Sequence, residues 1–115
     1  MMLLQLLLRL TQEQMEILST LLEKLSTTQE DGSALLDKSM VMVGSIFGDA
    51  NKHDTSNMPI LLAGGGFQHG QHIAFDPKDN APTCNLFVSM LERLGIHDLG
   101  SFSSSTGKLA GLELA

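Results

Sequence analysis

Two short, unbroken apolar runs constrain the fold of this chain more than any other feature. The first is Met40-Val41-Met42-Val43, and the second is Pro59-Ile60-Leu61-Leu62-Ala63, which three glycines, Gly64 to Gly66, bring to an end. Continuous apolar runs of this length are typical of strands that are covered on both faces, and proline is tolerated at the first position of a strand. Both runs are therefore expected to be buried strands. The segment His72-Ile73-Ala74-Phe75 is predicted to add a short third strand.

A first helix is predicted from about Gln12 to Ser26. Thr11 and Gln14 have the spacing of a capping box, in which each side chain satisfies a free amide of the first turn. The helical period is then followed by the apolar residues Met15, Leu18, Leu22 and Leu25. The apolar residues before this segment, including Leu3, Leu4, Leu7 and Leu8, are expected either to extend the helix backward or to pack against an element that this chain does not contain.

A second helix is predicted after residue 80. Asn80 or Ala81 would cap it, Pro82 suits its first turn, and Gly95 would end it in a left-handed conformation. Its apolar face would consist of Leu86, Phe87, Met90, Leu91 and Leu94. The remainder, from Ser101 to Ala115, is expected to be an irregular tail.

These elements predict an α/β fold with two main helices packed on a small, mostly buried sheet. A length of 115 residues suits one domain. Strands buried on both faces need more cover than two helices supply, and their edges need neighbours. Residues 1–115 are therefore expected to form a single partial domain, a C-terminal fragment of a longer α/β protein. Association with further copies could also cover the sheet edges.

Composition excludes some functions. The chain has 13 acidic against 7 basic residues, a net charge of −6, and neither Trp nor Tyr, so nucleic-acid binding is disfavoured. The apolar start from Met1 to Leu10 is shorter than the roughly 20 residues that span a bilayer, and it lacks the basic leader and cleavage site of a signal peptide. Cys84 is the only cysteine, so an internal disulfide is impossible and the cellular compartment stays open.

The polar loop between the two apolar runs holds the main candidate site residues, Asp49, His53 and Asp54. Imidazole nitrogens and carboxylate oxygens are suitable ligands for zinc and similar divalent ions, and a loop at a strand end can bring them together. The alternative is structural. Aspartate is favoured in turns, so Asp49 and Asp54 would cap turns while His53 bonds a backbone carbonyl.

Four further features have a functional and a structural interpretation. His69 and His72 could share a metal only if the chain bends at Gly70, because their spacing puts them on opposite faces of a strand. The glycines from Gly64 to Gly66 could bind an anion or simply form a turn. Cys84, near a helix start, is either an activated thiol or a small packing residue. His97 would interact with a helix dipole.

Several segments, taken in order, resemble a known family. They are Leu22-Glu23-Lys24-Leu25, Gly32-Ser33-Ala34-Leu35-Leu36-Asp37, the loop from Gly48 to Asp54, and the run from Pro59 to Gly66. Together, over about Leu21 to Leu112, they resemble the C-terminal part of a bacterial family called domain of unknown function 1552. The resemblance implies a distant alkaline-phosphatase or sulfatase-like architecture and an exported, periplasmic parent protein.

The resemblance also implies a possible activity. If the parent is an enzyme, it would be a metal-dependent hydrolase of phosphate or sulfate esters, in which Asp49, His53 and Asp54 help to hold a divalent ion. The nucleophile would come from an upstream part, so this chain would not be active alone, and no catalytic residue is identified in it. The contrasting hypothesis is a noncatalytic binding or scaffold domain. Its apolar N-terminal helix would dock on a partner, either the missing N-terminal part of the parent or another copy.

Overall fold

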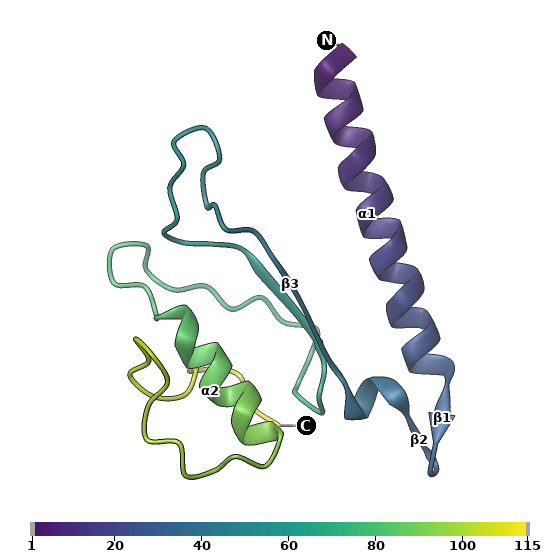
Figure 1. Ribbon diagram of the computed structural model, residues 1–115, viewed down its shortest axis with the longest axis vertical. Helices are drawn as coiled ribbons and strands as arrows, with labels where there is room; N and C mark the ends of the chain where they lie inside the picture. Colours follow the sequence, from purple (N-terminus) through teal and green to yellow (C-terminus); the bar gives the residue numbers. More distant parts are fainter. Residues whose placement is uncertain (1, 115) are drawn as a thin grey trace. The chain divides into compact units, whose positions relative to one another are not determined.

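The computed structural model describes residues 2–114, which divide into two compact units between Ser39 and Met40. The first unit contains helix α1 (Met2–Thr27), strands β1 (Gln29–Glu30) and β2 (Ser33–Ala34), and the short 3-10 helix η1 (Leu35–Lys38). The second contains strands β3 (Met40–Gly44) and β4 (Ile60–Gly64) and helix α2 (Thr83–Arg93) (Figure 1).

Helix α1 is longer than its predicted core and includes the apolar residues that precede Thr11. Of the two alternatives for these residues, backward extension of the helix is confirmed. The prediction that Thr11 caps the helix is wrong, because its hydroxyl donates to the Leu7 carbonyl oxygen at 3.1 Å in the helix interior. Leucine, methionine, glutamine and arginine are all good helix formers, so nothing in this stretch interrupts the helix.

The end of α1 leads into a tight hairpin. The hydroxyls of Thr27 and Thr28 donate to the carbonyl oxygens of Glu23 at 2.9 Å and Lys24 at 2.7 Å, and the Thr28 amide donates to the same Lys24 oxygen at 3.0 Å. Asp31 and Gly32, with φ of 50° and 81°, then form the two-residue turn between the antiparallel strands β1 and β2. Two left-handed residues in succession suit the right-handed twist of a hairpin.

Strands β3 and β4 form a second antiparallel hairpin, with a register that runs from Met40 opposite Gly64 to Gly44 opposite Ile60. The prediction of two strands is confirmed, but their burial is not that of central strands, since Met42 is 41% and Leu61 45% exposed. The third strand, predicted at 72–75, is wrong because this segment is irregular.

The predicted alkaline-phosphatase-like arrangement, with two helices on one mostly buried sheet, is therefore wrong. The structure has mixed α and β content, but its sheets are two separate antiparallel pairs, β1 with β2 and β3 with β4. An apolar run does not reveal the direction of its partner. Strands joined by a turning loop pair antiparallel, whereas a parallel pair needs a crossover, which the polar segment between β3 and β4 does not provide. Helix α1 and the β3–β4 sheet also belong to different units.

Helix α2 begins and ends close to the predicted residues. Pro82 is its N-cap, so the predicted caps Asn80 and Ala81 lie just outside it. Gly95, with φ of 92°, confirms the predicted stop. Its amide donates to the Glu92 carbonyl oxygen at 3.0 Å and the next amide, that of Ile96, reaches back to α2, which is the pattern of a Schellman motif.

The core of the second unit lies around α2. Its buried apolar residues are Phe67, Leu86 and Val88. Phe67 pairs with Leu114 as an isolated antiparallel bridge, so the end of the chain returns to the segment that follows β4. The tail from residue 101 onward contains no other strand or helix within the described residues.

Candidate functional site

The loop that joins β3 to β4 brings Asp49 and Asp54 opposite each other. The Asp54 amide donates to the Asp49 carbonyl oxygen at 3.0 Å, and the Gly48 amide donates to the Asp54 carbonyl oxygen at 2.8 Å. This isolated bridge closes a tight turn over residues 50–53. His53 lies within it at φ of 50°, a left-handed conformation that is uncommon for a residue with a side chain.

Both carboxylates accept hydrogen bonds from their own turns. Asp49 Oδ1 accepts from the Asn51 amide at 3.0 Å and from the Lys52 amide at 3.3 Å. Asp54 Oδ1 accepts from the Ser56 hydroxyl at 2.6 Å and from the Ser56 amide at 2.8 Å. The Ser56 hydroxyl and then its amide lower the pKa of Asp54 below its ordinary value, because both bonds favour the charged carboxylate. This is the turn-capping arrangement of the structural interpretation.

His53 makes an aromatic contact rather than completing a shell of ligands. Its ring lies 5.3 Å from the Phe47 ring, centroid to centroid, at an interplanar angle of 37°. Among residues 2–114, no group of three or more His, Cys, Asp or Glu side chains is placed to hold a metal ion. The structure thus brings Asp49 and Asp54 together through their backbones, and their side chains stabilise the loop.

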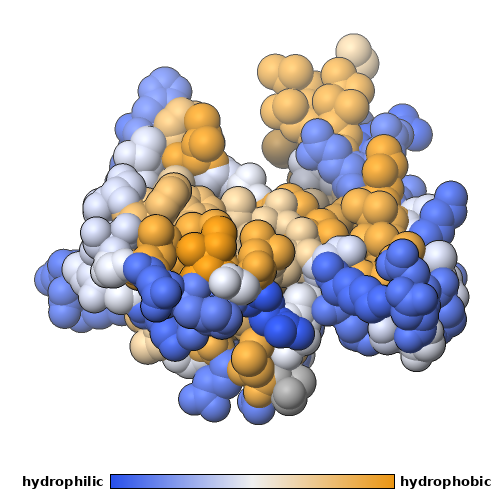
Figure 2. Space-filling view, turned by 60° about the horizontal axis from the view of Figure 1, so that its bottom comes forward, coloured by the Kyte–Doolittle hydropathy of each residue, from blue (hydrophilic) through white to orange (hydrophobic). Residues whose placement is uncertain are grey.

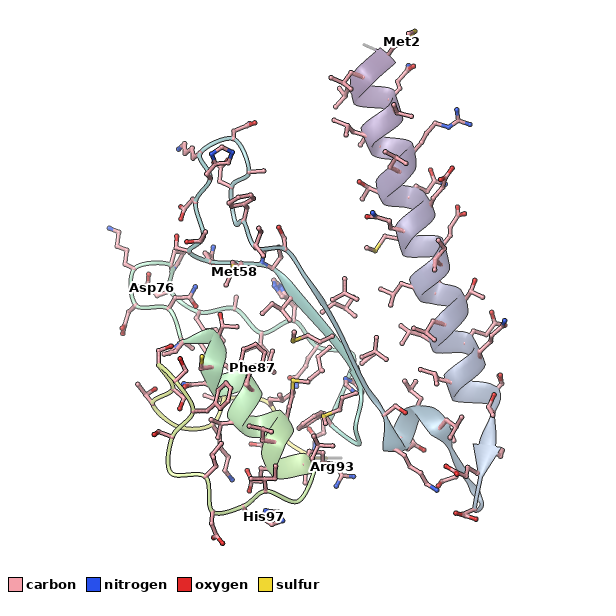
Figure 3. All side chains as sticks on the ribbon, in the orientation of Figure 1. Met2, Met58, Asp76, Phe87, Arg93 and His97 are labelled. Atoms are coloured by element: carbon pink, nitrogen blue, oxygen red, sulfur yellow. The ribbon has the colours of Figure 1, made fainter. Side chains whose placement is uncertain are left out.

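The other predicted histidines lie apart from this loop. His69 Nε2 lies 2.7 Å from the Gly64 carbonyl oxygen, within hydrogen-bond distance. The chain does bend at Gly70, which has φ of 81°, but His72 follows in an irregular and exposed segment. His97 lies beyond the Gly95 stop of α2 (Figure 3).

The glycines at the end of β4 form a turn that offers its carbonyl groups to side chains. All three, from Gly64 to Gly66, have φ between 72° and 85°. Arg93, at the C-terminal end of α2 (Figure 3), donates from Nε to the Gly65 carbonyl oxygen. An anion site would use the backbone amides of the glycines. At this turn the carbonyl oxygens of Gly64 and Gly65 make the contacts, and carbonyl oxygens attract cations.

Cys84 lies in the first turn of α2 and is partly buried. The Ser104 hydroxyl approaches its Sγ at 3.5 Å, and hydrogen bonds from Ser104 lower the pKa of the thiol. A lowered pKa increases the thiolate fraction, but a reaction needs a bound substrate as well. The geometry of Cys84 is that of a thiol packed against the C-terminal tail.

The most buried polar side chains, Asn85 and Ser89, are ones that the sequence did not single out. Both are 6% exposed and lie one turn apart on α2. Asn85 bonds Thr106, and Ser89 Oγ accepts from the Leu109 amide at 3.0 Å. The available signal was two polar residues at helical spacing on an otherwise apolar face. Their role is to fasten the tail to α2.

A cleft of about 600 Å³ lies beside the C-terminal end of α2 within the second unit. Its lining includes Arg93, His97 and Lys108. Lys108 pairs with Glu92 Oε2 at 2.8 Å, and Arg93 donates to the glycine turn. The positive charges of Lys108 and Arg93 at this cleft are therefore already engaged with groups of the protein itself.

Helix α1 exposes the largest set of apolar side chains. None of its residues is buried, and only Leu18, Leu22 and Leu25 are half-buried. Its exposed large apolar residues are Met2, Leu3, Leu4, Leu6, Leu7, Leu8, Leu10, Met15, Ile17 and Leu21. Figure 2 shows apolar surface on this helix at the upper right. No helix within residues 2–114 is both long and apolar enough to cross a membrane.

A shallow groove runs along the C-terminal half of α1. It is formed on one side by Met15, Leu18 and Leu22 of the helix and on the other by Leu36 of η1, and Ser19, Glu23 and Ser26 complete its lining. Both elements belong to the first unit. An apolar floor beside an exposed apolar helix is the kind of surface that receives another protein segment.

No protein-family model, no curated protein and no solved structure matches this chain. The class that the structure itself defines is a small mixed α/β chain of two units, one of which carries a long, exposed, apolar helix.

Proposed function

We propose that this chain is a noncatalytic interaction module that binds a protein partner through the apolar surface of α1. The observation that supports this proposal is the exposure of that surface: Leu4 is 58%, Leu8 is 62% and Met15 is 46% exposed. Scattered apolar residues are normal on a protein surface, but a contiguous apolar surface is typical of an interaction site. Burying one leucine side chain contributes about 1.5–3 kcal/mol, so a partner that covers several of them would bind stably.

The alternative, a part of a metal-dependent ester hydrolase, has less support from the geometry. Asp49 and Asp54 accept hydrogen bonds within their own turns, and His53 packs on Phe47. A metal site would need additional ligands from another chain or segment. The resemblance to domain of unknown function 1552 stays a prediction, and the family name supplies no activity.

The test is the native size of the chain in extracts of its source cells. The wild-type chain should migrate as a complex larger than its own 12.4 kDa, and Leu4→Glu with Leu8→Glu should release it, because a charge in an apolar contact is strongly unfavourable. A matched control, Glu13→Gln with Glu16→Gln, changes two charges on the same helix and should leave the complex intact. Free migration of the wild-type chain, or a complex that survives the Leu4 and Leu8 substitutions, would contradict the proposal.

A further inference from the structure

The apolar residues of α1 include a seam with the spacing of a coiled coil. In steps of four and three residues, the seam runs through Leu4, Leu8, Thr11, Met15, Leu18, Leu22 and Leu25. Six of these seven residues are apolar, and the pattern continues over three heptads of one uninterrupted helix. A repeat of 3.5 residues keeps one stripe of a helix facing a second helix as the two wind around each other. Each seam residue then packs between four residues of the facing helix.

The positions that flank the seam carry no charge. On one side they are Gln5, Gln12, Ser19 and Ser26, and on the other Leu7, Gln14 and Leu21. The charged residues of α1, namely Arg9, Glu13, Glu16, Glu23 and Lys24, all lie outside these positions. In a parallel pair of identical helices, the flanking positions on one side face those on the other side of the partner, and in an antiparallel pair each side faces its own copy. Like charges at facing positions select against pairing. In this helix no such repulsion opposes an identical partner in either orientation.

The length and period of the seam identify its partner. With 26 residues, α1 is about 39 Å long at the helical rise of 1.5 Å per residue. The other helix of the described chain, α2, has 11 residues, and its Leu86 and Val88 are buried in its own unit. Leu18 and Leu22 also line the groove beside Leu36 of η1, so the open part of the seam runs from Leu4 to Met15. Among the described elements, the one helix with a matching seam is therefore α1 of another copy.

We infer that α1 forms a coiled-coil dimer with α1 of a second copy of this chain. This inference rests on the proposed function, since it names the partner of the same apolar surface. Leu4, Leu8 and Met15, which are 58%, 62% and 46% exposed, become buried in the pair. Thr11 is the one polar seam residue, and its hydroxyl is already bonded to the Leu7 carbonyl oxygen, so its burial leaves no free donor.

Sedimentation equilibrium of the purified full chain tests the dimer. The wild-type mass should approach twice the 12.4 kDa of one chain as concentration rises. Leu8→Lys with Met15→Lys places charges in the seam and should weaken dimerisation by at least about 100-fold. The matched control, Leu6→Lys with Ile17→Lys, removes two comparably exposed apolar residues outside the seam and should change it by less than about threefold. Equal weakening by both variants would show nonspecific apolar association and overturn the inference.

Cysteine crosslinking tests the same contact without adding charge. In a Cys84→Ser background, Met15→Cys lies near the middle of the seam and should form an interchain disulfide under mild oxidation, at least about tenfold faster than Glu13→Cys on the outer side of the helix. Equal rates would overturn the inference. A purified chain that stays monomeric, while the complex in extracts still depends on Leu4 and Leu8, would refute self-pairing and leave the proposed function standing. A monomeric purified chain, together with the absence of a complex that depends on Leu4 and Leu8 in extracts, would refute both the dimer and the proposed function.

Discussion

The side chain of Asn85 forms two hydrogen bonds with Thr106. Its Oδ1 accepts from the Thr106 amide at 2.8 Å, and its Nδ2 donates to Thr106 Oγ1 at 3.1 Å. Asn85 is almost fully buried whereas Thr106 is exposed, so this pair fixes the surface tail to the buried face of α2. An amide side chain is suited to this role, since it offers a donor and an acceptor side by side.

Asn85→Ala should therefore destabilise the second unit by about 1–3 kcal/mol, because it removes two hydrogen bonds that each contribute about 0.5–1.5 kcal/mol. Chemical denaturation followed by circular dichroism measures the change. The matched control is Asn80→Ala, which removes an exposed bond of 3.2 Å to Asn57 and should change the stability by no more than about 0.5 kcal/mol. Equal effects of the two substitutions would contradict the role assigned to Asn85.

Gly65→Ala should destabilise more than Gly70→Ala. Both glycines are left-handed, with φ of 72° and 81°, so each substitution costs about 1–2 kcal/mol in backbone strain. At Gly65 a Cβ would also approach Met40 Cγ to 2.6 Å, whereas at Gly70 it would meet no atom within 4 Å. Thermal unfolding of the two variants isolates the steric effect. Similar midpoints would mean that the glycine turn is not packed against Met40.

Ser56→Ala should raise the pKa of Asp54, because the Ser56 hydroxyl is the main cause of its depression below 3.8. The folded-state pKa lies below the unfolded one, so the bond favours folding above the unfolded pKa and loses this effect as pH falls through the folded pKa. A carboxyl-carbon NMR titration of both proteins measures the shift, and Thr55→Ala is the control. An Asp54 pKa that is the same in Ser56→Ala and wild type would refute the bond.

Zinc titration of the full chain should reveal no one-to-one site that depends on His53. Asp49 and Asp54 use one carboxylate oxygen each within their own turns, and His53 packs on Phe47. Calorimetry on the wild type, His53→Ala and the control His97→Ala compares them directly. A stoichiometric site that disappears only in His53→Ala would restore the metal hypothesis for this loop.

Features that depend on neighbouring residues could be predicted from the sequence. Pro82 and Gly95 delimit α2 for local reasons: the ring of Pro82 fixes its φ, and Gly95 tolerates the left-handed conformation that ends the helix. The apolar runs predict β3 and β4 because a short run of apolar residues that ends at glycines is itself the signal of a strand. Thr11 was ambiguous, since its hydroxyl can cap a helix or bond back to the preceding turn, and only the residues before it decide between the two.

Features that depend on distant partners could not be predicted in the same way. The pattern at 72–75 suits a strand, but strands need a neighbour, and this segment is held instead by Gln71, whose Nε2 donates to the Gly111 carbonyl oxygen at 3.1 Å. Ser89 looks like an ordinary polar helix residue until its partner, Leu109, is known. For the loop between β3 and β4, the residue types suggested metal ligands. The structure shows instead that the carboxylates of Asp49 and Asp54 accept hydrogen bonds from backbone amides of their own turns.

The contacts of Gln68 with Glu113 and Leu114 determine when, during synthesis, the second unit can finish folding. Its amide donates to the Glu113 carbonyl oxygen at 2.8 Å, and its side chain donates to the Leu114 carbonyl oxygen across 46 residues of sequence. Closing so long a loop has an entropic cost that must be met before the contact stabilises anything. On a ribosome, the second unit therefore cannot complete its folding until residue 114 has left the exit tunnel. Helix α1 leaves the tunnel before any part of the second unit.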